Sequence, residues 1–191
     1  MELIFATQNE HKVKEIRLQL PKDIQLLSLK DMDFMNELEE DFDTLEENSM
    51  QKARFVFEQF KKPCFAEDTG LEIEALNGEP GVRSARYAGE GKDSNDNMDK
   101  VLTALIGKNN RKAHFKTVIT YKDANEEKQF IGILEGNIGY TQIGNGGFGY
   151  DPIFMINEHT SLAEIPKEEK SNISHRGKAF RKLLDYVKNS Y

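Results

Sequence analysis

The order of apolar patterns at the start of the chain is the strongest constraint on its fold. An apolar run at residues 3–6 is followed by polar residues, and over residues 10–20 apolar side chains recur at helical spacing. Pro21 ends that pattern, and residues 24–29 then have the composition of a second strand. Two strands joined through a helix form a parallel pair. The chain is therefore predicted to contain a sheet with parallel strands.

Helical and extended patterns continue to alternate along the rest of the chain. Thr44 and Glu47 fit a capping box, which predicts a helix from this point to about residue 60. Two long strands at residues 115–121 and 130–140 predict an antiparallel hairpin. The other expected elements are a strand from residue 64 that ends in a turn at 67–70, a strand at 71–75, a loop over 77–91, a helix over 98–107 and a last helix with an apolar face at 179–187. The sum is a single α/β domain over residues 1–191, with a long mixed sheet flanked by helices.

The composition limits the classes of function. No apolar run approaches the roughly 18 residues of a membrane-spanning helix. The balance of 26 Lys and Arg against 33 Asp and Glu gives a net charge of −7, which argues against nucleic acid as a partner but allows a small anionic ligand in a locally positive cleft. Cys64 is the one cysteine, and the N-terminus lacks the pattern of a signal peptide. We therefore expect a cytoplasmic protein, with neither a membrane nor a nucleic acid as its partner.

Residues 7–12 form a polar loop between the first strand and the first helix. Such a loop can present backbone N–H groups and a helix N-terminus to an anion, and Lys12 would add a positive charge. In the alternative interpretation, Asn9 caps the helix and Lys12 lies in solvent. Residue types alone favour this alternative, because asparagine is a common N-cap.

Carboxylates gather in two places further along the chain. Residues 37–47 are rich in Asp and Glu, most of which are expected to be solvated. Asp68 differs because it follows an apolar run, where a carboxylate is expected to be partly buried. Mg²⁺ typically takes one or two carboxylates together with phosphate oxygens and waters. Asp68 is therefore a candidate to bind a metal ion or to accept a proton from water.

Glycines and aromatic residues gather in the segment 146–152. This composition suits a backbone that approaches a flat group closely, with an aromatic ring available to stack on a base. The spacing matches neither a P-loop nor a dinucleotide fingerprint. A glycine-rich turn with core aromatics explains the segment equally well.

A fourth cluster lies near the start of the last helix, where Ser174 is the expected cap. It contains Lys170, His175 and Arg176. Cations in a first turn oppose the helix dipole by about 0.3–1 kcal/mol each, so an offsetting anion is needed, and a ligand phosphate is one candidate. The alternative is an ordinary charged surface. With no zinc motif in the sequence and little to indicate a nucleophilic cysteine or serine, the four clusters together indicate Mg²⁺-dependent phosphate-ester chemistry on a nucleotide.

Six motifs in these clusters and between them form a pattern of their own. They are Thr7-x-Asn9-x-x-Lys12, Glu47-Asn48 with Lys52-Ala53, Asp68-Thr69-Gly70-Leu71, Pro80-Gly81-x-x-Ser84-Ala85-Arg86, Gly146 through Phe154, and Lys170-Ser171 with Ser174-His175-Arg176. In this order and over nearly the whole chain, the sequence resembles the inosine triphosphate pyrophosphatase family, whose members remove deaminated purine nucleotides.

The resemblance implies hydrolysis of ITP, dITP and XTP to the monophosphate and pyrophosphate with Mg²⁺. It also implies an elongated fold of two lobes with the active site in the cleft, usually in a homodimer. Asp68 is implied to be the proton acceptor and a metal ligand, with Glu40 as the second metal carboxylate, although Glu39 or Glu47 could take that place. The implied substrate-binding residues are Thr7, Gln8, Asn9, Glu10, His11, Lys12, Thr69, Phe148, Gly149, Tyr150, Asp151, Lys170, His175 and Arg176.

The sequence departs from the usual family pattern at four positions. Gln8, Glu67, Thr69 and Ser49 stand where Gly, Asp, Ser and Ala are usual. A side chain at Gln8 could crowd the phosphate loop, so a catalytically silent purine nucleotide-binding protein is the alternative function. Selectivity for a 6-oxo purine would need a donor facing O6, which His175, Arg176 or a backbone N–H could supply.

Overall fold

The β-α-β start expected from the sequence is present in the computed structural model, which describes residues 1–190. Strand β1 (Glu2–Phe5) leads into helix α1 (Glu10–Arg17). Strand β2 (Gln25–Ser28) then pairs with β1 in parallel, in register from Glu2 opposite Gln25 to Phe5 opposite Ser28. The prediction of parallel strands is therefore confirmed.

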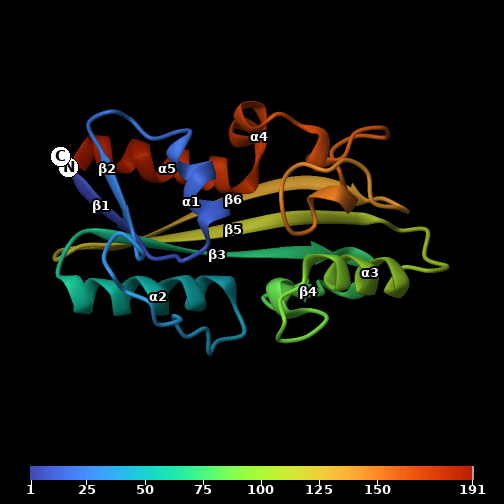
Figure 1. The fold of residues 1–191 in the computed structure, drawn as a ribbon, viewed down its shortest axis with the longest axis horizontal. Coiled ribbons are helices and arrows are strands. Elements are labelled where there is room, and N and C mark those ends of the chain that lie inside the picture. Colours follow the sequence, from blue (N-terminus) through green and yellow to red (C-terminus); the bar gives the residue numbers. More distant parts are fainter. Residues whose placement is uncertain (191) are drawn as a thin grey trace. The chain divides into compact units, whose positions relative to one another are not determined.

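Seven strands form one mixed sheet. The remaining strands are β3 (Cys64–Ile73), β4 (Pro80–Gly81), β5 (Lys112–Lys122), β6 (Glu127–Ile138) and β7 (Phe154–Met155). Their order is β2-β1-β3-β5-β6-β7, with β4 paired to β3 outside this path (Figure 1). Strand β1 is parallel to β2 and β3, whereas β4 is antiparallel to β3 and β7 is antiparallel to β6. The mixed α/β class predicted from the sequence is thus confirmed.

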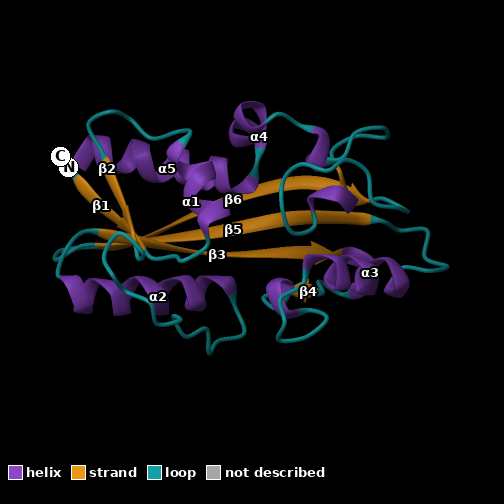
Figure 2. Cartoon of the chain, viewed as in Figure 1, coloured by secondary structure: helices purple, strands orange, loops and turns teal. Residues whose placement is uncertain are grey.

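Helices and loops fill the connections between the strands (Figure 2). The remaining α-helices are α2 (Leu45–Phe60), α3 (Ser94–Ala104), α4 (Lys167–Ile173) and α5 (His175–Ser190), and short 3-10 helices lie at Glu74–Leu76, Ser84–Arg86, Asp151–Ile153 and Leu162–Glu164. The Thr44 side chain accepts from the backbone N–H of Glu47, as the capping box predicts. Helix α3 begins earlier than expected because Asp93 caps it. Within residues 1–190, no helix combines the length and apolarity needed to cross a membrane.

The largest correction concerns the turn expected at residues 67–70. Strand β3 continues without a break from Cys64 to Ile73, so the two predicted strands are one. Gly70 is needed for a different reason: a Cβ added there would lie 2.7 Å from the carbonyl oxygen of Gly81, in strand β4, which pairs antiparallel with β3 at this point. The glycine permits a close approach of two backbones instead of a turn.

The chain divides into two compact units, each with its own core. Unit 1 contains residues 1–68, 117–132 and 174–190, and unit 2 contains residues 69–116 and 133–173. In unit 1, α1 and α5 cover one face of the sheet and α2 covers the other (Figure 1).

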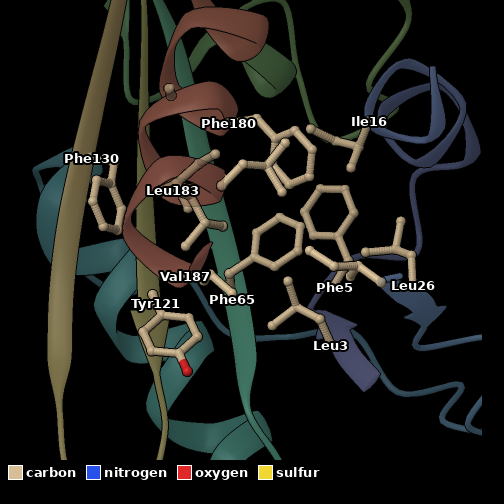
Figure 3. Packing of buried hydrophobic residues seen from close by; sticks show 14 of the residues in the cluster. Leu3, Phe5, Ile16, Leu26, Phe65, Tyr121, Phe130, Phe180, Leu183 and Val187 are labelled. Atoms are coloured by element: carbon tan, nitrogen blue, oxygen red, sulfur yellow. The ribbon is translucent and has the colours of Figure 1, made fainter. Parts of the chain in front are cut away.

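In the central strands of unit 1, β1 and β3, successive apolar side chains point to opposite faces of the sheet, so both faces are buried. Phe5 and Phe65 stack with ring centroids 4.4 Å apart, and Phe65 packs on Phe180 of α5 (Figure 3). Their neighbours Ile4 and Ala66 point the other way and belong to the cluster under α2. Strands buried on both faces are typical of parallel sheets covered by helices on each side.

The core of unit 2 lies between α3 and its strands. Met98, Val101 and Leu105 of α3 are buried in one cluster with Leu71 and Ile73 of β3. Phe115 and Phe154 pack with ring centroids 4.6 Å apart in the same cluster. The Tyr150 hydroxyl, buried beside them, donates to the backbone carbonyl of Ser84 at 2.7 Å and ties the glycine-rich segment to the loop after β4.

Candidate active site

Two carboxylates of unit 1 converge on one buried ammonium group. Lys52, on α2, donates to Glu40 Oε1 at 2.7 Å and to Asp68 Oδ1 at 2.9 Å. Both Lys52 and Asp68 are buried, whereas the Glu40 side chain is 28% exposed. The structure thus brings together the two residues expected to bind metal, and adds a lysine between them to which the sequence analysis gave no role.

The other two acidic candidates are distinguished from Glu40 by their surroundings. The Glu47 carboxylate accepts from the Thr44 hydroxyl at 2.7 Å, at the start of α2. Glu39 is exposed. Of these three carboxylates, Glu40 is the one whose ion pair with Lys52 brings it close to Asp68.

The electrostatics of this cluster favour proton transfer at Asp68. Burial raises the pKa of the Asp68 carboxyl above its ordinary value, and the neighbouring Glu40 carboxylate raises it further, against the attraction of Lys52. For Lys52, burial lowers the pKa, but attraction to Asp68 and Glu40 outweighs it and leaves the ammonium charged. A carboxylate with a raised pKa is a better proton acceptor near neutral pH.

The donor set fits a hard divalent cation. Over residues 1–190, no group of three or more His, Cys, Asp and Glu side chains is arranged to hold a metal ion. Glu40 and Asp68 supply two carboxylates that already share a cation, the Lys52 ammonium. Mg²⁺ commonly takes one or two carboxylates and completes its shell with phosphates and water.

A second ionic cluster surrounds Glu67, the residue before Asp68. Its carboxylate is fully buried and accepts from Arg176 Nε at 2.8 Å, from Arg176 Nη2 at 2.9 Å and from Lys12 Nζ at 2.9 Å. Arg176 Nη1 also donates to Glu15 at 2.6 Å. Burial raises the pKa of Glu67, but Arg176 and Lys12 outweigh it and hold that pKa well below its ordinary range.

The Glu67 cluster corrects two expectations. Lys12 does not lie on a solvated face, because its ammonium group pairs with a buried carboxylate. Arg176 does not belong to an ordinary charged surface, because it is buried and pairs with Glu67 and Glu15 of this chain. Sequence reasoning missed Glu67, although its position inside the apolar run of β3 was a signal that it needed partners.

The other residues of the 7–12 loop mostly organise its backbone. The Asn9 side chain accepts from the backbone N–H groups of His11 and Lys12, which confirms the predicted cap. Thr7 Oγ1 accepts from the backbone N–H of Asn9, and Glu10 pairs with Lys30. The Gln8 side chain turns away from these groups and donates to the carbonyl of Asn36 at 2.8 Å.

Unit 2 holds a third cluster, built around Asp151. Lys170 donates to Asp151 Oδ2 at 2.6 Å, and the backbone N–H of Phe148 donates to the same oxygen at 2.7 Å. The Lys170 ammonium also lies 5.0 Å from the centroid of the Phe148 ring. Gly147 has a φ of +71°, and a Cβ added there would lie 2.0 Å from Asp151 Oδ2. The glycine therefore lets this carboxylate fold back against the backbone.

The remaining predicted site residues are Thr69, Gly149, Tyr150 and His175. Thr69 follows Asp68 on β3 and is half-buried. Gly149 has a φ of +65°, and Ser174 Oγ caps α5 by accepting from the N–H of Gly177, which leaves His175 buried in the first turn. Tyr150 is a core residue whose hydroxyl already has a partner, and burial raises its pKa.

Comparison with known proteins gives one consistent result. The model of the Ham1 family matches residues 3–186. A Flavobacterium psychrophilum protein named dITP/XTP pyrophosphatase is 52% identical over 190 residues, covering 99% of this chain and 100% of that protein. A Porphyromonas gingivalis protein of the same name is 45% identical over 97% of each chain. The solved structure of the Staphylococcus aureus Ham1 protein matches with a TM-score of 0.90 at 35% identity over the whole of both chains, and a HAM1 protein from Coxiella burnetii with 0.89 at 34% over 99% of each.

Proposed function

Because this chain belongs to the Ham1 family, we propose that it hydrolyses non-standard purine nucleoside triphosphates to the monophosphate and pyrophosphate. The proposed substrates are ITP, dITP and XTP, and the proposed role is removal of deaminated purines from the nucleotide pool. Relatives named dITP/XTP pyrophosphatase, up to 52% identical over nearly the full length, support the reaction. The single structural observation that carries the proposal is the convergence of Glu40 and Asp68 on Lys52.

In this mechanism Asp68 orients a water molecule and accepts its proton. The raised pKa of its carboxyl suits that role, and the attack of the water breaks the α–β phosphoanhydride bond. Glu40 and Asp68 would hold Mg²⁺, which when bound would neutralise charge on the phosphates. In the protein without ligand, the Lys52 ammonium pairs with both carboxylates.

We propose that the residues predicted from the sequence bind the nucleotide. In unit 1 the 7–12 loop and Lys12 serve the triphosphate, and His175 and Arg176 serve the base. In unit 2 Thr69, Phe148, Gly149, Tyr150, Asp151 and Lys170 bind substrate. For the 6-oxo group of the base, His175 or a backbone N–H is the better donor, because Arg176 Nε, Nη1 and Nη2 already donate to Glu67 and Glu15. With adenine, such a donor would face the 6-amino group and stay unpaired, so the site would discriminate strongly against adenine nucleotides.

We also propose that residues 1–191 act as one functional domain, in a cytoplasmic homodimer. Size-exclusion chromatography with light scattering at several protein concentrations measures the oligomeric state. A mass of one chain at every concentration would contradict the dimer.

The experiment that tests the function is pyrophosphate release from dITP, XTP, dGTP and dATP. It is run with Mg²⁺ and with EDTA, on the wild type and on Asp68→Asn. Release from dITP and XTP that needs Mg²⁺ and is lost in the variant supports the proposal. Orthophosphate as the first product would contradict the cleavage position. Tight dITP binding without hydrolysis would favour the silent nucleotide-binding protein.

A further inference from the structure

The segment that carries Glu40 has no regular structure of its own. Within the described chain, residues 36–43 lie in no helix or strand. An irregular segment of this kind has no neighbouring strand to fix its backbone, and ordering it costs roughly 1–2 kcal/mol of conformational entropy per residue. Whatever holds the segment therefore decides how often the Glu40 carboxylate is in place.

One face of α2 holds this segment at three consecutive residues. Lys52 binds the Glu40 carboxylate at 2.7 Å. Gln51 binds Asp41 twice: its Oε1 accepts from the backbone N–H at 3.1 Å, and its Nε2 donates to Oδ2 at 2.6 Å. Positions 48, 51 and 52 lie on the same side of a helix, because they are three and four residues apart.

Asn48 completes the set and binds the backbone of Phe42. Its Oδ1 accepts from the Phe42 N–H, and its Nδ2 donates to the Phe42 carbonyl, each at 2.9 Å. The side-chain amide thus satisfies both backbone groups of one residue, as a neighbouring strand would. Asn48 is completely buried, so these two groups of Phe42 are paired by a side chain that has no freedom to move away.

The far end of the segment is held by a residue from another element. Gln8, in the loop before α1, donates to the carbonyl of Asn36 at 2.8 Å. The segment is therefore fixed at residue 36 and again at residues 40–42. The Glu40 side chain, which is 28% exposed, lies between these two fixed points and pairs with Lys52.

We propose that Asn48 and Gln51 are positioning residues that keep the Glu40 carboxylate beside Asp68, and thereby set the affinity of the site for a divalent cation. This inference rests on the proposed function only in assigning Glu40 to the metal. Neither side chain touches substrate or the reacting atoms in this proposal. Both act through the backbone and side chains of residues 41 and 42.

The first readout is amide hydrogen exchange of residues 36–43, measured without metal or nucleotide. The variants are Asn48→Ala and Gln51→Ala, with Gln59→Ala as the matched control because Gln59 lies exposed on the same helix. Loss of two neutral hydrogen bonds should speed exchange in this segment by about tenfold, and loss of Gln51 should have a smaller effect. Exchange in the control should equal that of the wild type.

The second readout is Mn²⁺ binding to the nucleotide-free protein, followed by electron paramagnetic resonance. Asn48→Ala should weaken Mn²⁺ binding by about three- to tenfold, since an unrestrained carboxylate must be ordered again on binding. In the hydrolysis of dITP, the Mg²⁺ concentration for half-maximal rate should rise by a similar factor, while kcat at saturating Mg²⁺ recovers. A purely structural role would instead lower the amount of folded protein and leave the Mg²⁺ requirement unchanged.

The outcomes separate this inference from the proposed function. Unchanged exchange in Asn48→Ala overturns the inference, and so does faster exchange with unchanged Mn²⁺ binding. If Asn48→Ala does not fold, the half-buried Gln51 carries the same test. A wild type that releases no pyrophosphate would contradict the proposed function, and the exchange and Mn²⁺ measurements would still decide the role of Asn48.

Discussion

Glu67 and Asp68 are neighbours in sequence and opposite in character. Glu67 shares the face of β3 that packs on α1 and α5, and there one carboxylate meets Arg176 and Lys12. Asp68 lies on the α2 face, where two carboxylates meet the single cation Lys52. The pKa of Glu67 is lowered because Arg176 and Lys12 outweigh its burial. The pKa of Asp68 is raised because burial and the Glu40 carboxylate outweigh Lys52 and Lys12.

This comparison separates a structural carboxylate from a candidate catalytic one. With Glu15 included, the Glu67 cluster contains two carboxylates and two cations, so its charge is balanced. The Asp68 cluster contains two carboxylates and one cation and opens to solvent through Glu40. Both residues carry a carboxylate. The surplus of negative charge and the access to solvent make the Asp68 cluster the candidate site for a cation.

The largest expected effect is on catalysis at Asp68. Asp68→Asn should lower pyrophosphate release from dITP by about 10²- to 10⁴-fold, the usual contribution of a general base. Thermal unfolding should change little, because Lys52 keeps its pair with Glu40. Steady-state rates and a melting curve on the same preparation check both. A variant that keeps its activity would remove Asp68 from the mechanism.

The opposite pattern is expected at Glu67. Glu67→Gln removes the buried carboxylate that pairs with Lys12 and with Nε and Nη2 of the buried Arg176, and should lower the free energy of unfolding by about 3–5 kcal/mol. Urea unfolding followed by circular dichroism measures this difference. Equal loss of stability in Asp68→Asn and Glu67→Gln would break the distinction between the two faces.

The pH dependence of that loss sharpens the comparison. Because the pKa of Glu67 in the folded protein lies below the ordinary value of 4.5, its contribution to stability is fully present above that pH and is lost as the pH falls below it. The stability difference between wild type and Glu67→Gln should therefore be constant from pH 7 to 5 and shrink below 4.5. A difference that grows on acidification would contradict the assigned pKa direction.

In unit 2, Gly147→Ala tests the third cluster. The added methyl group would displace the Asp151 carboxylate from Lys170 and Phe148, and the positive φ adds strain of about 1–3 kcal/mol. We expect kcat/KM for dITP to fall by about tenfold, mostly through a higher KM. Gly91→Ala, where the structure leaves open space for a Cβ, is the control and should match the wild type.

The smallest expected effect concerns Cys64, which lies on the Asp68 face of β3, one residue before Phe65. Burial raises the pKa of its thiol to about 12. At pH 8 about one thiol in ten thousand would be ionised, so iodoacetamide should label the native protein very slowly and the urea-unfolded protein quickly. Rapid labelling of the native protein would mean that solvent reaches Cys64 on this face of β3, and would contradict its burial.

Local patterns in the sequence predicted the elements, whereas contacts between distant residues decided the site. The β-α-β start, the Thr44 cap of α2 and the cap at Asn9 depend on neighbours a few residues apart, and all three were predicted. The partner of Glu67 is Arg176, 109 residues away, and no local signal connects them. Asp68 and Glu40 were identified through resemblance and the apolar run, but Lys52 received no role because its two partners meet only in the fold.

The break predicted at Gly70 shows a different limit. A glycine after two carboxylates indicates a turn when only the chain itself is considered. Here the missing side chain of Gly70 leaves room for the backbone of Gly81. The Ser84 hydroxyl stabilises this contact by accepting from the Leu71 N–H and donating to the Gly81 carbonyl. The requirement for glycine at position 70 therefore comes from a contact with residue 81, which local sequence patterns do not show.

The close approach of the backbones at Gly70 and Gly81 also constrains how the protein can evolve. No side chain of any size fits at position 70 while Gly81 keeps its place, and Gly81, with a φ of +54°, is itself poorly replaced. A substitution at Gly70 would be tolerated only if the loop that contains Gly81 were rebuilt, and a substitution at Gly81 would likewise require a new backbone conformation there. Mutational drift should therefore leave the pair untouched in functional variants, and a selection on a library randomised at both positions should return glycine at each.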